Sequence, residues 1–341
     1  MLLIIAEKPG IYDALSALPI TLNTTDIVYT YAYGLYEPSK PNINFQSIPC
    51  TPEWGDDHLK SYYTKESIQW VNGGFKQKNY ARDIMAAIKD RMHEYTEIII
   101  ATDADRVGAY SALQLLQKLS DIEPNIVTRI PVIAWSKQAI LKGYHERQRY
   151  METGIEVEAK QQHLKRTFDY WWKINAELVF GEVCKECDLR GNPAVSKYEL
   201  MLYFFLAMNP VPKSAYEIVK WMQNPPSRKT HSESVRQKVT IGSSVSHMSI
   251  LETAVERGAV IGSYVEDDNP RGVKMVYALS GRAHKFLSRM HPKTRDDDLP
   301  YRLYEWMSCD LSEIDETKEK IRRYINTLFG RQLRYQRRNN M

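Results

Sequence analysis

Short apolar runs alternate with amphipathic stretches through the first part of the chain, and this alternation limits the possible folds more than any other feature. The apolar runs are rich in Val and Ile, which favour strands, whereas the stretches between them have the apolar spacing of helices. Strands that alternate with helices indicate a parallel or mostly parallel sheet. We therefore predict an α/β domain over residues 1–135, with strands at LLIIA, DIVYTYAYG, EIIIATDAD and NIVTRIPVIAW and helices at NYARDIMAAIKDRMHEY and VGAYSALQLLQKL.

The pattern then becomes mainly helical, and we predict a second, mainly helical domain over residues 136–341. Long helices are expected at 154–183 and 195–207. The Pro- and Ser-rich segment 208–234 is interpreted as a connector or an exposed loop. MSILETAVERGAVI is typical of a helix closed by Gly258, and two β-like runs follow it around the turn residues DNPRG. A helix followed by a hairpin outlines a small winged element.

The composition is that of an ordinary soluble globular chain, with 341 residues, 43% hydrophobic and 26% charged. No apolar run approaches the roughly 18 residues of a membrane span, and the start MLLIIA lacks the basic residues of a leader peptide. We therefore expect a cytoplasmic protein without a membrane partner. Four cysteines are too few for a disulfide framework. Cys184 and Cys187 form one C-x-x-C, but a zinc site needs a second ligand pair, so a buried or loop pair is favoured.

Acidic side chains follow two of the predicted strands. Glu7 follows LLIIA, and Asp103 and Asp105 follow EIIIAT. Ligands of parallel sheets collect where the strands end, and Mg²⁺ prefers one or two carboxylates together with phosphate oxygens and water. These three acids are therefore the candidate catalytic residues and metal ligands, with Mg²⁺ as the expected cofactor over a phosphodiester. An alternative remains open, because an Asp after a strand commonly caps the next helix.

IIAEKPG and EIIIATDADRVG resemble the signatures of the Toprim domain of type IA DNA topoisomerases, which read close to IAEKPS and ATDxDREGE. Weaker similarity continues in YTYAYGLYEP, RIPVIAWSKQAI, RTFDYWWKINAEL, AVSKYELMLYFFL and VYALSGRAHKFL. The resemblance implies a Toprim domain over 1–135, followed by a helical DNA-binding domain with a basic C-terminal tail. It also implies that Mg²⁺ binds at Glu7, Asp103 and Asp105 and that DNA is the partner.

The chain departs from this family at the residues that carry its reaction. Family members cleave one DNA strand with a tyrosine in a separate domain, but here only about 45 residues separate SKYEL from MSILETAV, so that domain cannot fit. Two Y-x-R triplets, which begin at Tyr80 and Tyr335, do not match the family's position. Val107 and Ala109 replace both glutamates of the family's D-x-D-R-E-G-E. No nucleophilic tyrosine is identified, and whether the chain is an enzyme stays open.

Basic side chains are the candidate contacts to nucleic acid. The net charge of +4 is too small to argue for such binding, but residues 321–341 carry six arginines and no acid. This basic tail is interpreted either as a nucleic-acid contact or as a disordered terminus. The resemblance adds cations beside the acids and in the later motifs. The candidates are Lys8, Arg106, Arg166, Lys197, Arg331, Arg334, Arg337 and Arg338. Trp171 and Trp172 are expected to pack in a core rather than to stack on bases.

The leading hypothesis is a reduced type IA topoisomerase-like protein that binds DNA, in single-stranded form, without relaxing supercoils alone, as an accessory or with a protein partner. One alternative is a Mg²⁺-dependent Toprim nuclease or phosphotransferase that uses Glu7 and the two aspartates. Another is a protein-interaction module without catalysis. We expect weak Mg²⁺ binding, because Val107 replaces an acid and because Lys8 and Arg106 compete for the remaining ones.

Overall fold

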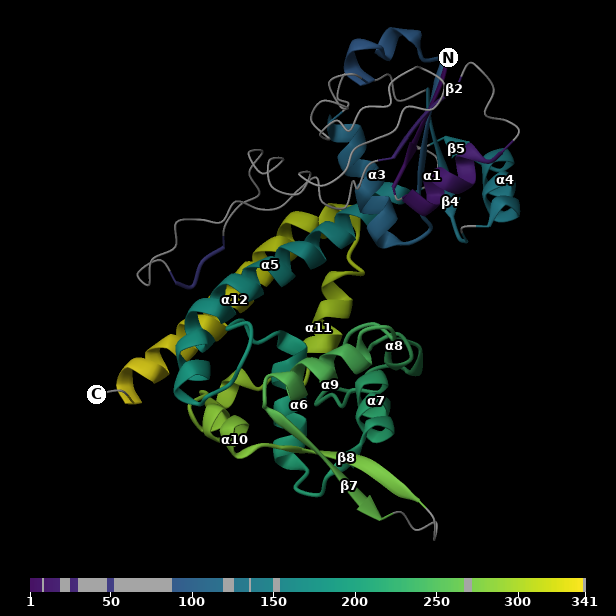
Figure 1. The fold of residues 1–341 in the computed structure, drawn as a ribbon. Helices are drawn as coiled ribbons and strands as arrows, with labels where there is room; N and C mark the ends of the chain where they lie inside the picture. Colours follow the sequence, from purple (N-terminus) through teal and green to yellow (C-terminus); the bar gives the residue numbers. More distant parts are fainter. Residues whose placement is uncertain are drawn as a thin grey trace. The chain divides into compact units, whose positions relative to one another are not determined.

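The computed structural model describes residues 1–7, 9–18, 25–29, 48–51, 88–118, 126–134, 136–149, 154–266 and 272–339. These residues form two compact units, which are described one at a time (Figure 1). Of the described residues, the first unit contains those up to Leu164, except 48–51, together with Asp310–Ile314, so it extends past the boundary predicted at residue 135. The second unit contains residues 48–51, Lys165–Cys309 and 315–339. The long helix α5 (Ile155–Glu186) therefore contributes residues to both units.

The first unit is built on a five-stranded sheet in the order β2-β1-β3-β4-β5. The first four strands in this order are parallel to one another, and only β5 runs antiparallel. The predicted α/β class with a mostly parallel sheet is thus confirmed. The strands are β1 (Leu2–Ala6), β2 (Thr25–Tyr29), β3 (Glu97–Asp103), β4 (Val127–Val132) and β5 (Gln148–Arg149).

Helices cover both faces of this sheet because successive strand residues point to opposite sides. In β3, Ile99 and Ala101 pack with α1 and α4 on one face, whereas Ile98 and Ile100 pack with α3 and the start of α5 on the other. Both faces of the central strands are therefore buried. The helices are α1 (Pro9–Ser16), α3 (Arg106–Lys118) and α4 (Lys137–His145).

Parts of two predicted elements fall outside the described residues. The strand DIVYTYAYG is described only through Tyr29, as β2. Of the helix predicted at 79–95, residues 79–87 lie outside the described ranges, and Met92–Glu94 form a short 3-10 helix, η4.

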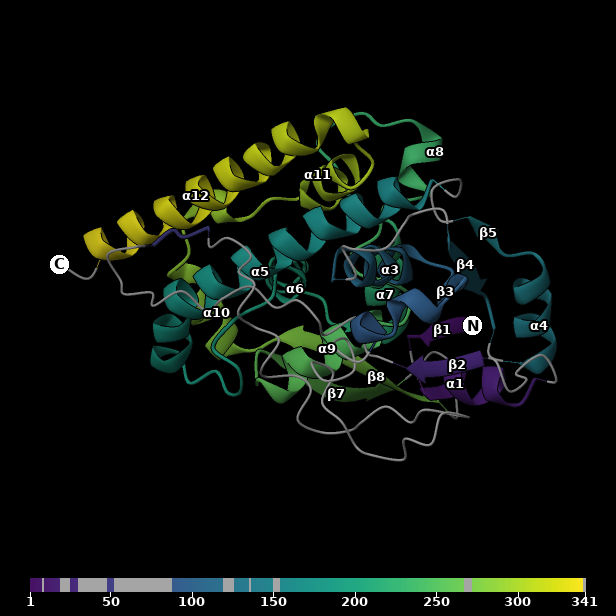
Figure 2. The same ribbon diagram turned by 90° about the horizontal axis from the view of Figure 1, so that it is seen from above.

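The second unit is mainly helical, as predicted. Its longest elements, α5 and α12, run side by side in both views (Figures 1 and 2), and the Gln336 side-chain amide donates a hydrogen bond of 3.0 Å to the Val179 carbonyl. The 3-10 helix η8 (Leu311–Glu313), which belongs to the first unit, precedes α12. The other elements are α6 (Lys197–Met208), β6 (Lys213–Ser214), α7 (Ala215–Gln223), α8 (Glu233–Arg236), α9 (His247–Glu256), β7 (Val260–Glu266), β8 (Val273–Leu279), α10 (Gly281–Ser288), η7 (Pro292–Thr294), α11 (Leu299–Trp306) and α12 (Ile314–Asn339).

The interpretation of 208–234 as a connector or loop was wrong in its middle, where α7 lies. Ser214 and Glu217 form a capping box, in which Glu217 Oε2 accepts the Ser214 N–H at 2.8 Å and Ser214 Oγ accepts the Glu217 N–H. Ile218 and Met222, one turn apart, are buried. The signal was the S-x-x-E spacing before an apolar stripe, which the abundant Pro and Ser outweighed.

The predicted helix and hairpin are confirmed. α9 ends before Gly258, whose φ of +74° lies in the left-handed region that glycine tolerates. β7 and β8 then pair antiparallel from Val260↔Leu279 to Glu266↔Val273, and β6 adds a third strand. The turn residues 267–271 lie outside the described ranges.

Trp171 and Trp172 belong to the core of the second unit, as predicted, with only 2% and 3% of their surface exposed. All four cysteines also lie in this unit and carry free thiols. Cys184 and Cys187 are both buried, and burial raises the pKa of the Cys184 thiol to about 12. Among the described residues, none of the helices combines the length and the apolar character that crossing a membrane requires.

Candidate functional site

Glu7 and Asp103 lie together at one edge of the sheet. β1 and β3 are neighbouring parallel strands in register, so the residues that end them are brought side by side. The Glu7 N–H donates to the Ala101 carbonyl at 2.9 Å, and the Asp103 N–H donates to Glu7 Oε2 at 2.9 Å. Glu7 is 1% exposed. The predicted adjacency of these two acids is confirmed.

Arg129, on β4, fixes the end of β3 from the other side. It is 6% exposed, and it donates from Nε to Thr102 Oγ1 at 3.1 Å and from Nη2 to the Asp103 carbonyl at 2.7 Å. The guanidinium thus places a positive charge beside the acidic edge. Sequence reasoning missed this residue, although an arginine inside the apolar run NIVTRIPVIAW was a visible signal, because buried cations need a partner.

Asp105 caps the helix that follows the strand. Its Oδ1 accepts the Gly108 N–H at 2.8 Å, and its carbonyl accepts the Ala109 N–H at 2.9 Å. The second contact is the first hydrogen bond of α3 itself, and the side-chain contact satisfies an N–H that the first turn would otherwise leave unpaired. The helix cap that the sequence left open is thus present, and a metal-binding role of Asp105 stays a prediction.

Gly108 allows the start of α3 to lie directly against the end of β3. A Cβ atom built at this position would lie 2.1 Å from the carbonyl oxygen of Asp103. No side chain other than hydrogen fits at such a distance from backbone. The glycine of the TDADRVG motif therefore sets how closely helix and strand approach beside Glu7.

The described residues fit a magnesium ion only in part. Within the described portion of the chain, no group of three or more Asp, Glu, His or Cys side chains is arranged to hold a metal. Glu7 and Asp103 come together, but one Glu7 oxygen already accepts a backbone N–H, and Asp105 caps α3. Two carboxylates can still contribute to a Mg²⁺ site that phosphate oxygens complete.

Of the two phosphate contacts predicted in the first unit, only one lies among the described residues. Arg106 is exposed at the first position of α3, where its side chain can meet a ligand from solvent. Lys8 lies outside the described residues.

Lys197, in the second unit, is buried rather than presented to solvent. Its ammonium pairs with Asp169, which also pairs with Lys165 at 2.8 Å. Burial would raise the pKa of Asp169, but the Lys197 and Lys165 charges hold it below its usual range. The Lys197 Nζ also lies 4.3 Å from the centroid of the Tyr198 ring. The charge of Lys197 is thus already compensated inside the unit. The other predicted contact of this unit outside the tail, Arg166, is half-buried on α5.

The basic tail is helical. Arg331, Arg334, Arg337 and Arg338 all lie on α12, which continues to Asn339. Arg331 is half-buried, and the other three are exposed. The four predicted contacts are therefore carried on an ordered helix, so their directions around its axis can be compared.

Comparison with known proteins agrees with the motifs. Residues 3–135 match the family profile of the Toprim domain. DNA topoisomerase 1 of Pyrococcus horikoshii is 22% identical over 193 residues, which cover 54% of this chain and 27% of that protein. The solved structure of full-length topoisomerase I from Thermotoga maritima is 13% identical with a TM-score of 0.40, and the match covers 62% of this chain and 31% of that one. The chain thus spans about a quarter of the length of the curated relative that it matches.

Proposed function

We propose, from the premise that the chain carries a Toprim domain and is related to type IA DNA topoisomerases, that it binds single-stranded DNA and does not relax supercoils by itself. In this proposal the chain is a reduced topoisomerase-like protein. It would serve as a DNA-binding accessory or act with a protein partner.

The observation that carries this proposal is the short path between α6 and α9. The resemblance implies a tyrosine-bearing domain inserted there, whereas residues 209–246 of this chain contain the short strand β6, the helices α7 and α8, and their connections. Glu199 of α6 and Arg257, just after α9, form an ion pair of 2.8 Å, so the two flanking helices are tied together. A domain that could present a nucleophilic tyrosine has no place in this path.

The sheet edge supports the same conclusion. Ala109 stands where the family signature has its second glutamate, and it is fully buried among the apolar residues between α3 and the sheet. Val107 replaces the first glutamate. The edge therefore offers fewer carboxylates for chemistry, while the cations elsewhere on the chain remain available for phosphates.

We expect the purified chain to leave negatively supercoiled plasmid unchanged and to form no covalent tyrosyl–DNA adduct. We also expect it to bind a single-stranded oligonucleotide with an affinity that falls steeply with salt, because phosphate contacts release counterions. Gel electrophoresis with an active type IA topoisomerase as positive control, and a salt titration by fluorescence anisotropy, measure both. Relaxation or an adduct would contradict the proposal. If an adduct formed, Tyr335→Phe would show whether Tyr335 carries it. Salt-independent binding, or none, would favour a protein-interaction module.

A Mg²⁺-dependent nuclease or phosphotransferase is the second candidate, and the juxtaposition of Glu7 and Asp103 favours it. When bound, Mg²⁺ would polarise a phosphodiester for attack. Glu7 and Asp103 would hold the ion, and Arg106 and Lys8 would orient the phosphate. Because two carboxylates are a small ligand set, we expect the free chain to bind Mg²⁺ weakly and more strongly when a nucleic-acid phosphate adds oxygen ligands.

The double change Asp103→Ala and Asp105→Ala is expected to abolish any Mg²⁺-dependent cleavage and to retain most DNA affinity. Loss of the Asp105 cap should cost about 1 kcal/mol of stability. Asp13→Ala with Asp90→Ala is a matched control, since both side chains are exposed in the same unit and the charge change is equal. A nuclease assay measures cleavage, and fluorescence anisotropy measures DNA affinity, for both double variants. Tight Mg²⁺ binding by the free chain, or DNA binding lost only in the first pair with the fold retained, would show that the site is misassigned.

A further inference from the structure

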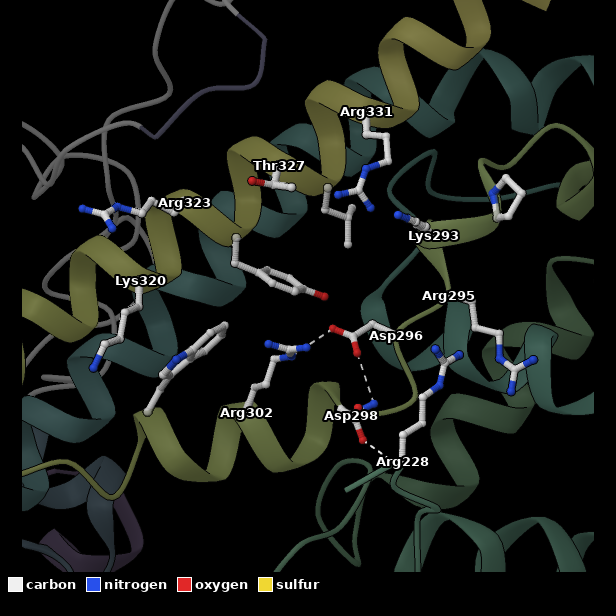
Figure 3. A pocket seen from close by; sticks show the side chains of 14 residues that line it. Arg228, Lys293, Arg295, Asp296, Asp298, Arg302, Lys320, Arg323, Thr327 and Arg331 are labelled. Atoms are coloured by element: carbon white, nitrogen blue, oxygen red, sulfur yellow. Dashed lines mark hydrogen bonds and ion pairs between the residues drawn. The ribbon is translucent and has the colours of Figure 1, made fainter. Parts of the chain in front are cut away.

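A strongly basic cavity lies in the second unit, apart from the acidic sheet edge. It has a volume of about 680 Å³ and is lined by α11, by α12 and by the segment that contains η7 (Figure 3). Seven Lys or Arg side chains line it, against two Asp. Such an excess of one charge around a hollow attracts ligands of the opposite sign.

The acids of this region are already engaged by neighbouring groups. Asp296 pairs with Arg302 at 3.3 Å. Asp297, beside the cavity, pairs with Arg228 at 3.2 Å and with Arg295 at 2.6 Å. At one end of the cavity, Lys320 and Arg323 form ion pairs with acidic side chains of α12 itself. These cations are therefore partly compensated by the protein.

Lys293 and Arg331 differ from the other cations of the cavity. Figure 3 shows both at the same end of the cavity, away from Lys320 and Arg323, and among the described residues neither forms an ion pair or a side-chain hydrogen bond. His291 lies beside them; burial lowers the pKa of its imidazole, and the charges of Arg331 and Lys293 lower it further. Positive charge is thus concentrated at this end, and no acid of the described part of the chain forms an ion pair with these two side chains.

Apolar surface complements these charges. Trp306, Tyr324 and Leu328 line the cavity, and the Trp306 and Tyr324 rings pack edge to face with centroids 5.6 Å apart. Aromatic faces beside cations are the usual elements of single-strand binding, because bases stack on the rings while the cations follow the backbone.

Cations continue along one face of α12 beyond the cavity. With about 100° of rotation per residue, side chains spaced by three or four residues share a face. The residues on this face, called the α12 stripe here, are Lys320, Arg323, Thr327, Arg331, Arg334 and Arg338. Lys320 and Arg331 are about 16 Å apart along the axis at 1.5 Å per residue, which is long enough to follow several nucleotides. Arg337 lies about 100° away from Arg338 and is not on the stripe.

We propose that this cavity and the α12 stripe bind the sugar–phosphate backbone of a single nucleic-acid strand, with Lys293 and Arg331 each contacting a phosphate at the end of the cavity that they share. The inference rests on the proposed function and deepens it, because it assigns the strand to particular residues. A continuous strand fits better than a free nucleotide, since the cations extend past the cavity to Arg334 and Arg338. Of the four arginines predicted to contact nucleic acid in the tail, this proposal assigns three to the strand and excludes Arg337.

The test compares two double variants of the full chain by anisotropy with an oligothymidylate of about 20 nucleotides. Lys293→Ala with Arg331→Ala is expected to weaken binding roughly tenfold, since each lost charge-assisted contact has a modest net effect. It should also reduce the slope of log K against log salt by about 1.4, at about 0.7 for each phosphate contact on a single strand. Arg322→Ala with Arg337→Ala removes the same charge from other faces of the same helix and should change both quantities much less.

The outcomes separate this inference from the proposed function. Equal effects of the two double variants, with the unchanged chain binding DNA normally, would overturn the cavity assignment and leave the function standing. Failure of the unchanged chain to bind any oligonucleotide would overturn both. Because Arg331 is half-buried, Lys293→Ala alone, at an exposed position, and Arg331→Lys, which keeps the charge but not the bidentate geometry, serve as variants that preserve the fold. Lys293→Ala should lower the slope by about 0.7, and an unchanged slope would contradict the assignment.

Discussion

Replacement of Arg257 by Met is expected to lower the free energy of unfolding of the second unit by about 3–5 kcal/mol, because it leaves the Glu199 carboxylate buried without its partner. The side chains of Arg257 and Glu199 are 4% and 5% exposed, and their atoms Nε and Oε1 are 2.8 Å apart. The guanidinium also donates to the carbonyls of Arg190 and Asn192. Burial would lower the pKa of Arg257, but the Glu199 charge raises it, so the side chain stays charged. Three groups would lose their donor at once.

Thermal unfolding measures this effect, with a decrease in Tm of roughly 6–20 °C expected for a unit of this size. Arg282→Met is the matched control, since Arg282 pairs with Asp188 at 2.8 Å on the surface, where the side chains are 41% and 74% exposed. Exposed pairs contribute about 0–1 kcal/mol. Glu199→Gln added to Arg257→Met should recover part of the loss, because the buried charge is then gone. Equal effects of Arg257→Met and Arg282→Met would refute this account of the buried pair.

Gly108→Ala is expected to have the second large effect, with about 1–3 kcal/mol lost from the first unit. The added Cβ would lie 2.1 Å from the Asp103 carbonyl oxygen and 2.8 Å from its nitrogen, and both are backbone atoms that no rotamer change can move. α3 must therefore move away from β3, which displaces Asp103 relative to Glu7. We expect lower thermal stability together with weaker binding of Mg²⁺ in the presence of oligonucleotide.

Gly281→Ala is the control for this change. Gly281 begins α10, and a Cβ built there meets nothing within 4 Å. Alanine should be neutral or stabilise by up to about 1 kcal/mol, because it restricts the unfolded chain more than glycine does. If Gly108→Ala behaved like Gly281→Ala in the melting experiment, the close approach of α3 to β3 would not be a constraint.

The sequence predicted the sheet and the pairing of Glu7 with Asp103 because both depend on local pattern. Apolar runs of Val and Ile marked the strands, and parallel strands necessarily end at the same edge. The role of Asp105 could not be decided in the same way, since a cap and a metal ligand share one residue type and one position. The contact with the Gly108 N–H shows the cap, whereas the metal-binding role stays a prediction.

Other features depended on contacts between distant residues. Arg129 is bound to the end of β3 by a side chain and a carbonyl that lie more than twenty residues away in the sequence. Lys197 was predicted to contact phosphate, but its neighbour Asp169 lies on another helix, and no spacing rule relates the two. The cavity beside α12 likewise combines residues from 228 to 331. Its excess of positive charge therefore could not be predicted from any single segment of the sequence.

The position of the cysteines gives the chain a natural chemical reporter. Thiol reagents attack the thiolate, and burial raises the pKa of Cys184 to about 12 and that of Cys50 to about 11. All four cysteines belong to the second unit, and Cys187 and Cys309 are buried as well. Alkylation of the native chain should therefore be slow and should accelerate when this unit opens, whatever happens to the other. The rate of modification would follow the opening of one half of the molecule without any introduced label.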